Sequence, residues 1–375
     1  MAVIDSIAVE HYRLPLEPPF HASWDPVPRR EFVNSVVRVR AGSLEGVGAG
    51  EAMHGLAGNE HLFIGQQPGN MQRHVQLLDN LQFFYGRMWP LEVALWDLWG
   101  QQLGQPLWRM LGGSSARVPL YASTGERQPA AQRAASARLL KARGFPALKL
   151  RFHAADPRAD LAIVQAVRTA IGPDMHILVD ANQGWQMAWD HTPTQWDFQT
   201  ACWMADALAE LDVYWLEEPL HRHDYRGLAA LRQRSRVRIA GGEANRDFHE
   251  QREYLRHGSL DVYQADVVWS TGITRARQLA AEVAAAGALY SPHTWGDALV
   301  LLANLHVSAA VSNAPFIEYP CDPPTWTAER RDFLLPAPLL DDGTGHLTLP
   351  DAPGLGVTLV MLTPLLTLDS NVFKS

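Results

Sequence analysis

From about residue 118 this chain of 375 residues repeats one unit, in which a short apolar run ends in polar residues and a helical stretch follows. Short apolar strands that alternate with helices are typical of a parallel sheet covered by helices. Eight repeats within about 200 residues favour a closed parallel α/β barrel over an open sheet. The runs expected to form strands are 118–123, 147–152, 177–182, 213–219, 239–243, 262–267, 288–293 and 314–319.

The first part of the chain follows a different pattern. Residues 3–16 and 32–50 alternate apolar and polar side chains like antiparallel strands, and a proline-rich loop, 17–28, joins them. Helical spacing of apolar residues appears afterwards, around Ala94. The expected division is therefore an N-terminal α+β domain, a barrel, and a C-terminal segment that packs back on the first domain, over 1–117, 118–340 and 341–375.

Charge and hydropathy exclude several classes of function. The chain has 32 Lys and Arg against 40 Asp and Glu, a formal net charge of −8, with no basic block, so we expect no nucleic-acid binding. No apolar stretch approaches the roughly 18 residues of a membrane span. The N-terminus carries Asp5 and does not resemble a signal peptide, and Cys202 and Cys321 are too few for a disulfide framework. We therefore expect a cytoplasmic protein that binds no membrane.

Carboxylates end three successive expected strands. In a parallel barrel the carboxyl ends of the strands meet at one mouth, where active sites lie. Asp180, Glu217 and Glu243 would share that mouth, and three like charges there are costly unless a cation binds them. A single acid at a strand end is usually a helix cap, but three in consecutive strands argue against that role. Oxygen ligands select a hard divalent ion, and Mg²⁺ suits their number.

Two cations and a possible base complete the mouth. Lys149 and Arg151 share one side of their strand, which in a barrel is the inside, so they either neutralise the carboxylates or hold a substrate carboxylate and its developing charge. Asp266 and His293 belong to adjacent strands, so Asp266 can accept from one ring nitrogen and leave the other free to take a proton. Glu318, in the eighth run, is a candidate acid that would share a proton with the bound carboxylate.

In chain order, the motifs Lys-x-Arg, Asp-x-Asn, Glu-Glu-Pro, Gly-Glu, Asp, Pro-His-Thr-Trp and Glu resemble the mandelate racemase group of the enolase superfamily. The resemblance covers nearly the whole chain. It implies a capping domain on a modified (β/α)₇β barrel and a homo-oligomeric, Mg²⁺-dependent enzyme. It also implies that Asp180, Glu217 and Glu243 bind the ion, and that a proton α to a substrate carboxylate is removed to give an enediolate.

One position departs from the pattern of this group. Racemases of the group commonly carry Lys-x-Lys on the second strand, where this chain has Arg151, and an arginine with a pKa above roughly 12 is a poor proton acceptor. The departure favours dehydration of an acid sugar to a 2-keto-3-deoxy acid with His293 as the base, while Arg151 clamps carboxylate or hydroxyl. Racemisation of a 2-hydroxy acid stays open if Lys149 acts as a base. A retired site that only binds ligand or serves as a scaffold is the non-enzymatic alternative.

The proline-rich loop 17–28 lies where similar proteins close over the substrate. We expect it to contribute His21 and Trp24 to the substrate pocket, although an ordinary surface loop would have the same composition. Further substrate contacts are expected from polar and aromatic residues that follow strand ends, chiefly Asn182 and Trp295, with Trp185 and Trp326 as additional candidates.

Overall fold

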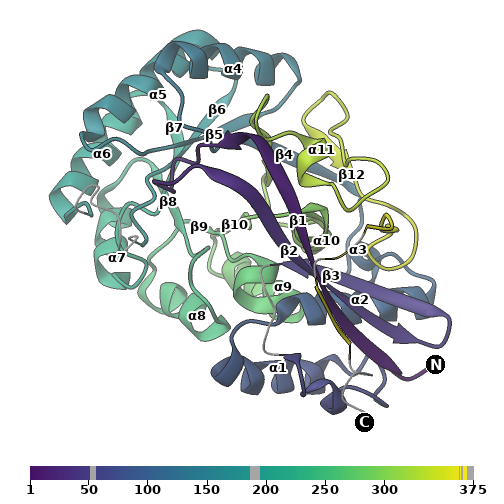
Figure 1. Ribbon diagram of the computed structural model, residues 1–375. Helices are drawn as coiled ribbons and strands as arrows, with labels where there is room; N and C mark the ends of the chain where they lie inside the picture. Colours follow the sequence, from purple (N-terminus) through teal and green to yellow (C-terminus); the bar gives the residue numbers. More distant parts are fainter. Residues whose placement is uncertain (51–55, 186–194, 363, 365, 370–375) are drawn as a thin grey trace.

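The computed structural model describes the chain except for residues 51–55, 186–194, 363, 365 and 370–375 (Figure 1). Within the described residues, an antiparallel sheet with its helices precedes a parallel barrel. The barrel strands run through the middle of its helices, and the antiparallel sheet lies across one side of the barrel (Figure 1). None of the helices among the described residues combines the length and the apolar character that crossing a bilayer requires.

The antiparallel sheet has the order β13-β1-β2-β3. Its strands are β1 (Ser6–Phe20), β2 (Arg29–Ala41), β3 (Leu44–Gly50) and β13 (Leu366–Asp369), so a strand from the C-terminal segment pairs with the first strand. The elements that follow β3 are a 3₁₀ turn, η2 (Glu60–Leu62), and the helices α1 (Met71–Tyr85), α2 (Trp89–Leu103) and α3 (Leu107–Met110).

Helix α2 packs on β3 because the strand offers no side chain at the points of contact. A Cβ atom at Gly46 would lie 2.2 Å from the carbonyl oxygen of Ala94, and one at Gly48 would lie 2.1 Å from that of Pro90. Only glycine allows the helix backbone to come this close.

Eight strands alternate with seven helices in the rest of the described chain, which gives the order (β/α)₇β. The strands are β4 (Arg117–Ser123), β5 (Ala147–Arg151), β6 (His176–Asp180), β7 (Val213–Glu217), β8 (Arg238–Gly241), β9 (Val262–Tyr263), β10 (Leu289–Tyr290) and β11 (Ile317–Pro320). The helices are α4 (Ala130–Ala142), α5 (Pro157–Ile171), α6 (Phe198–Glu210), α7 (Tyr225–Arg234), α8 (Phe248–His257), α9 (Gly272–Ala285) and α10 (Ala298–Ser308). A short helix, α11 (Ala328–Arg331), and a strand, β12 (His346–Thr348), follow.

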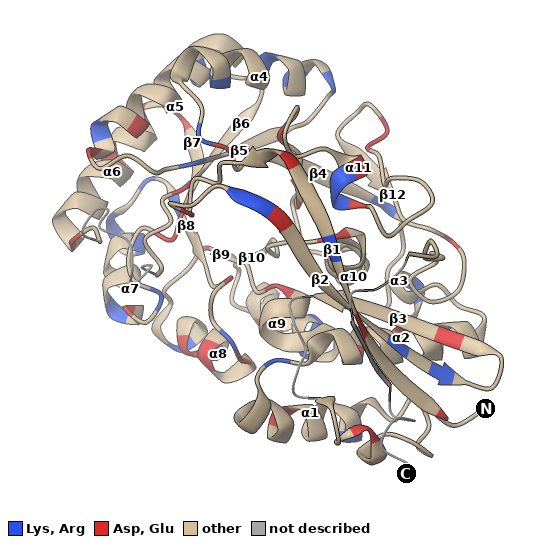
Figure 2. Cartoon of the chain, in the orientation of Figure 1, with Lys and Arg blue, Asp and Glu red and all other residues tan. Residues whose placement is uncertain are grey.

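The parallel strands have the spatial order β10-β9-β8-β7-β6-β5-β4-β11. The two end strands are bridged by side chains: Ser291 Oγ donates to the carbonyl oxygen of Phe316 at 2.8 Å, and Thr294 Oγ1 donates to that of Glu318 at 2.7 Å. These contacts close the sheet into the barrel that the sequence predicts. Figure 2 shows both signs of charge along the outer helices α5 and α8, in line with the absence of a basic block in the sequence.

Aspartate side chains begin most of the barrel helices. At α5, α6, α7, α8 and α10 an aspartate at the N-cap accepts hydrogen bonds from backbone N–H groups of the first turn. Helix α9 differs, because its N-cap Thr271 makes no such bond and Glu92 of α2 accepts from the backbone N–H of Thr274 at 3.0 Å instead. The N-terminal helices therefore supply a cap that a barrel helix lacks.

The expected strands are found, with two corrections to their limits. The parallel strands are mostly shorter than their apolar runs because the backbone leaves the ladder at the carboxyl ends, where Asn182 and Glu218 adopt positive φ angles of 50° and 46°. The loop predicted at 17–28 is also shorter: β1 continues to Phe20 and β2 begins at Arg29. The strands extend further because Phe20 is buried and pairs with Arg29 across the ladder.

Asp97 provides a test of how the N-terminal helices hold the rest of the chain. Its buried carboxylate accepts from the backbone N–H groups of Val47 at 2.8 Å and Leu355 at 2.7 Å. In the variant Asp97→Ala both groups lose their partner, and each unpaired buried group costs about 1–3 kcal/mol, so we expect the free energy of unfolding to fall by about 2–6 kcal/mol. Urea denaturation followed by circular dichroism measures the change. Asp351→Ala, which removes an exposed partner of Arg109, is the control and should leave the midpoint nearly unchanged.

Candidate active site

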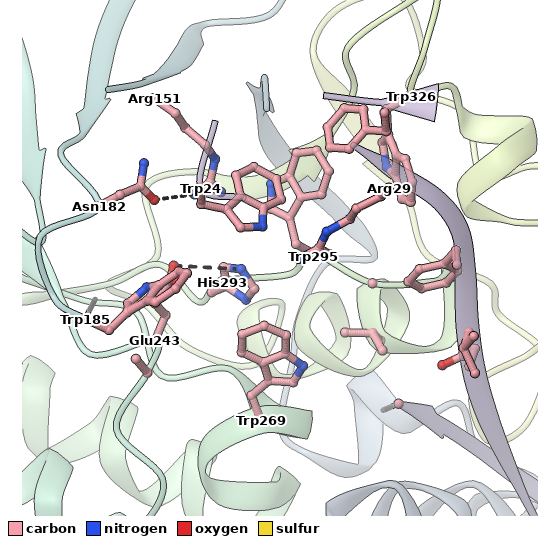
Figure 3. Close-up of a pocket in the computed structure, with 18 of the residues that line it drawn as sticks. Trp24, Arg29, Arg151, Asn182, Trp185, Glu243, Trp269, His293, Trp295 and Trp326 are labelled. Atoms are coloured by element: carbon pink, nitrogen blue, oxygen red, sulfur yellow. Dashed lines mark hydrogen bonds and ion pairs between the residues drawn. The ribbon is translucent and has the colours of Figure 1, made fainter. Parts of the chain in front are cut away.

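A cavity of about 650 Å³ lies at the carboxyl ends of the barrel strands (Figure 3). The barrel contributes Arg151, Asn182, Glu243, His293 and Trp295 to its lining, and the N-terminal sheet and its loop contribute Trp24, Arg29, Phe32 and Asn34. Two parts of the chain that are distant in sequence therefore enclose one space.

Three buried carboxylates sit together at the barrel mouth. Asp180 ends β6, Glu217 ends β7, and Glu243 follows β8, and one oxygen of each lies within 4.8 Å of the others. Among the described residues, this is the group that could hold a metal ion. Glu217 Oε2 and Glu243 Oε2 have no hydrogen-bond partner in the described part of the chain. His293 Nε2 lies 3.8 Å from Glu243 Oε2, an ionic contact too long for a hydrogen bond. Buried carboxylate oxygens that accept no hydrogen bond fit a hard divalent cation.

The carboxylates disturb one another's protonation. Burial, and then the charge of Asp180, raise the pKa of Glu217, and although Lys149 opposes this, the pKa reaches about 8. Like charges that share a site resist ionisation together. A bound divalent cation would reverse the effect, because it favours the ionised form of every ligand.

Lys149 lies beneath the cavity and does not line it. Its fully buried Nζ is 2.7 Å from Glu318 Oε1 and 3.1 Å from Glu217 Oε1. Burial and the charge of Arg151 lower the pKa of Lys149, but the neighbouring carboxylates raise it by a larger amount. The net shift of the pKa is upward, so the side chain stays an ammonium ion. Of the two cations expected to meet a substrate, only Arg151 reaches the cavity.

Arg151 connects the carboxylates with the aromatic wall of the cavity. Its Nη1 is 2.5 Å from Asp180 Oδ2, and its Nη2 is 3.4 Å from Glu318 Oε1. The guanidinium carbon lies 4.6 Å from the ring centroid of Trp24 and 5.5 Å from that of Trp295, within the range of cation–π contact. The side chain is therefore held from both sides, by acids below and by indoles toward the cavity.

Glu318 differs from the expectation of a protonated acid. Burial alone would raise the pKa of Glu318, but Lys149, His293 and Arg151 outweigh it and hold the pKa well below its usual range. Its carboxylate also accepts from Ser123 Oγ at 2.6 Å and from the backbone N–H of Thr294 at 2.8 Å. Glu318 is ionised among these partners and serves to place Lys149 and Arg151.

His293 and Asp266 form the expected pair. His293 Nδ1 is 3.0 Å from Asp266 Oδ2, and Asp266 Oδ1 accepts from the backbone N–H of Val268 at 2.7 Å. Because this carboxylate is an acceptor, Nδ1 carries the hydrogen and Nε2 is left to exchange a proton. Burial lowers the pKa of His293, but the charges of Glu243, Glu318 and Asp266 raise it to about 9, so without a cation the imidazole is protonated at pH 7. A divalent cation held by Glu243 would offset that charge and lower the pKa of His293, which a base requires.

The loop between β1 and β2 crosses the barrel mouth. The backbone N–H of Ser23 donates to the carbonyl oxygen of Gly125 at 2.8 Å, and that of Arg127 donates to His21 at 2.9 Å. Trp24 lines the cavity as expected, but His21 is exposed and is absent from the lining. The extension of β1 turns Phe20 inward and the next side chain outward, which moves His21 away from the site.

The remaining expected contacts lie where the strand ends place them. Asn182 lines the cavity, and its backbone N–H donates to Asp180 Oδ1 at 2.9 Å. Trp295 lines it as well, with Nε1 donating to Ser123 Oγ at 2.9 Å. Trp185 and Trp326 also border the cavity.

Sequence reasoning missed several residues of the site. Trp269 lines the cavity three positions after Asp266, so the rule that strand ends build the site could have found it. Asn34 lies inside β2 and reaches the cavity only because the sheet docks there, which no local pattern signals. Glu218 is buried, both of its oxygens lack a partner among the described residues, and burial raises its pKa well above the usual range.

A (β/α)₇β barrel with buried acids and a His–Asp pair at its strand ends defines a class of metal-assisted acid–base enzymes. The model of the family described as enolase C-terminal domain-like matches residues 131–362 of this chain. The chain belongs to the enolase superfamily, within its mandelate racemase group, which confirms the resemblance seen in the sequence.

Individual relatives match most of the chain. Arabinonate dehydratase of Saccharolobus solfataricus is 30% identical over 72% of this chain and 68% of that protein. The 3,6-anhydro-alpha-L-galactonate cycloisomerase of Streptomyces coelicolor is 31% identical over the same shares, 72% and 68%. A racemase from Streptomyces coelicolor, solved with bound magnesium, has a TM-score of 0.81 and 26% identity, and the match covers 95% of this chain and 97% of that one.

Binding of a divalent cation at pH 7 is expected to release close to one proton. Glu217, with a pKa of about 8, is mostly protonated at that pH, and a carboxylate must lose its proton to bind a metal. Affinity should therefore rise as the pH rises toward 8. Calorimetric titration with MgCl₂ in buffers of different ionisation enthalpy measures the released proton. Glu217→Gln should abolish the buffer dependence, and a heat independent of buffer in the unaltered protein would contradict the assignment.

Proposed function

We propose that the protein is a Mg²⁺-dependent hydro-lyase that converts an acid sugar to a 2-keto-3-deoxy acid. The proposal rests on one observation: His293 lines the cavity, oriented by Asp266 as a base, and the cavity position where racemases of the group commonly carry a second lysine holds Arg151 instead. Lys149, the alternative base, is buried below the cavity and forms ion pairs with Glu217 and Glu318. A site with one base supports elimination more readily than inversion at a carbon atom. The dehydratase among the relatives supports the same reaction.

Asp180, Glu217 and Glu243 would hold the Mg²⁺ ion, as their buried, converging oxygens fit it. When bound, the ion supplies positive charge that stabilises the substrate carboxylate as it gains negative charge. The structural relative with bound magnesium supports this choice of metal.

The side chains of this chain then divide the proton transfers. His293 Nε2 takes the proton from the carbon α to the carboxylate, and Asp266 stabilises the imidazolium that forms. Arg151 holds a carboxylate or hydroxyl oxygen of the substrate. The β carbon–oxygen bond breaks as the imidazolium returns its proton to the leaving hydroxide, which departs as water. The enol that remains becomes the 2-keto acid.

The same first step supports a second candidate. The relative named as an anhydrogalactonate cycloisomerase, at 31% identity, favours a substrate whose leaving group is a ring oxygen. The imidazolium would then protonate that oxygen, and no water would be released. Racemisation or epimerisation of a 2-hydroxy acid, suggested by the racemase neighbour, needs a second base opposite His293. The homo-oligomer and the cytoplasmic location expected from the sequence stay predictions.

Products distinguish these reactions in a screen of acid sugars with Mg²⁺. A dehydratase yields a 2-keto acid one water lighter than its substrate, which reacts with semicarbazide. A cycloisomerase yields an isomer of unchanged mass, and a racemase in D₂O returns substrate with deuterium at an inverted centre. We expect the first outcome. A screen across chain lengths and configurations without a 2-keto acid product would contradict it, and a protein that binds acids with no turnover would be a retired site.

The variant His293→Asn tests whether the site has one base. We expect exchange of the α proton with D₂O to fall by about 10²–10⁴-fold, the typical cost of losing a general base. Proton NMR of recovered substrate measures the exchange. His61→Asn, which alters an exposed histidine of the N-terminal part, is the control and should exchange normally. Exchange that survives in His293→Asn would show that Lys149 or Arg151 also removes protons.

A further inference from the structure

We infer that Trp269 is a positioning residue for the catalytic base: its indole, held by the N-terminal part of the chain through Arg87, keeps the imidazole of His293 in its reactive orientation. The inference rests on the proposed role of His293. It assigns a role to a residue that no strand-end motif singled out.

The backbone of Trp269 is fixed by the same carboxylate that orients His293. Trp269 lies in a π-helical turn, Val267–Thr271, directly after Asp266. Asp266 Oδ1 accepts from the backbone N–H of Trp269 at 3.1 Å, while Oδ2 faces His293 Nδ1 at 3.0 Å. π-helical turns are rare and recur at functional sites. The carboxylate of Asp266 therefore fixes the position of the His293 ring relative to the turn that carries the indole of Trp269.

The indole restricts a motion that the hydrogen bond leaves open. The hydrogen bond at Nδ1 allows the imidazole to turn about the line joining Nδ1 and its acceptor, which would move Nε2 away from the substrate. Nε2 also lies 3.8 Å from Glu243 Oε2, but this distance is too long for a hydrogen bond that would fix the ring plane. The ring centroids of Trp269 and His293 are 4.9 Å apart, with their planes at 37°. Figure 3 shows the indole beside the imidazole at the cavity, opposite Trp24 and Trp295. Contact over the ring face opposes that rotation.

Arg87 ties Trp269 to the N-terminal part of the chain. Between α1 and α2, Arg87 donates from Nη1 to the carbonyl oxygen of Trp269 at 2.7 Å, and its guanidinium carbon lies 5.8 Å from the indole centroid. The last residue of β3 also packs here, since a Cβ at Gly50 would lie 2.7 Å from Val268 Cγ1. The part of the chain that covers the cavity thus also supports the residue behind the base.

A wall of the substrate pocket would make the same contacts, but the two roles differ in kinetics. An indole that binds substrate contributes to KM. An indole that orients the base contributes to kcat, because a small misplacement of a reacting group can cost about 10²-fold in rate. Replacing Trp269 by an apolar residue without an aromatic ring, and separately by one with a ring, distinguishes the two effects.

The experiment compares Trp269→Leu with Trp269→Phe in α-proton exchange. We expect Trp269→Leu to lower kcat by about 10–100-fold with KM little changed, and Trp269→Phe, which keeps a ring face, to recover most of the loss. Trp203→Leu is the matched control: Trp203 is a partly exposed indole of α6 with Arg158 5.5 Å from its ring centroid, outside the cavity lining. A higher KM at unchanged kcat, or full kcat in Trp269→Leu, would overturn the inference.

A crystal structure of Trp269→Leu provides a reading that needs no turnover. We expect the imidazole of His293 to be rotated or spread over more than one orientation, and an imidazole in one unchanged orientation would overturn the inference. If the unaltered protein exchanges no α proton, the proposed function is refuted, but the crystal structure still tests whether Trp269 orients His293. If Trp269→Leu fails to fold, Arg87→Met replaces it, with a smaller loss of kcat expected and an unchanged kcat counting against the inference.

Discussion

Repulsion among buried carboxylates at the barrel mouth is the constraint on which the site depends. Six acids, Asp180, Glu217, Glu218, Glu243, Asp266 and Glu318, are buried there together with three groups that carry positive charge, Lys149, Arg151 and His293. If all of these groups were ionised, the cluster would lack three positive charges. Burial of unpaired charge is costly, so the barrel mouth favours a divalent cation on electrostatic grounds as well as by the geometry of its oxygens.

The cations within the cluster have different tasks. Lys149 is enclosed by carboxylates below the cavity, so its charge offsets theirs and stabilises the folded barrel. Arg151 reaches the cavity and also contacts the indoles of Trp24 and Trp295, so it links the acids to the loop that crosses the mouth. His293 lies beside Glu243, with Nε2 3.8 Å from Glu243 Oε2, is oriented by Asp266, and is the group whose proton can leave. The three side chains have different roles because Lys149 is buried below the cavity, whereas Arg151 and His293 reach it.

The sequence predicted what depends on strand ends and alternation. The barrel, the converging acids and the His–Asp pair all follow from the rule that parallel strands end at one mouth, and the structure brings those side chains together. The ionisation of Glu318 could not be predicted, because it depends on how deep Lys149 sits within the barrel. The placement of His21 depends on where β1 ends: the strand continues beyond Leu16 to Phe20, whose side chain is buried, so the next side chain, that of His21, faces away from the cavity.

The contacts that join site residues to distant parts of the chain were also beyond sequence reasoning, even where the position of a residue after a strand could have been recognised. Trp269 depends on a π-helical turn and on Arg87, which lies 182 positions earlier. Asn34 reaches the cavity from the middle of a strand, and its side chain bonds Asp297 at 2.5 Å only because the sheet docks on α10. Such contacts are set by docking, and no periodicity within either segment records them.

The pairing of β13 with β1 affects the order in which the molecule can be completed. The other strands of the sheet that carries the loop over the cavity precede the barrel in the sequence, yet its outer strand, Leu366–Asp369, follows the barrel. During synthesis the edge of β1 has no neighbour from its own chain until the barrel has emerged. Assembly of the cover over the cavity is thereby coupled to completion of the catalytic strands beneath it.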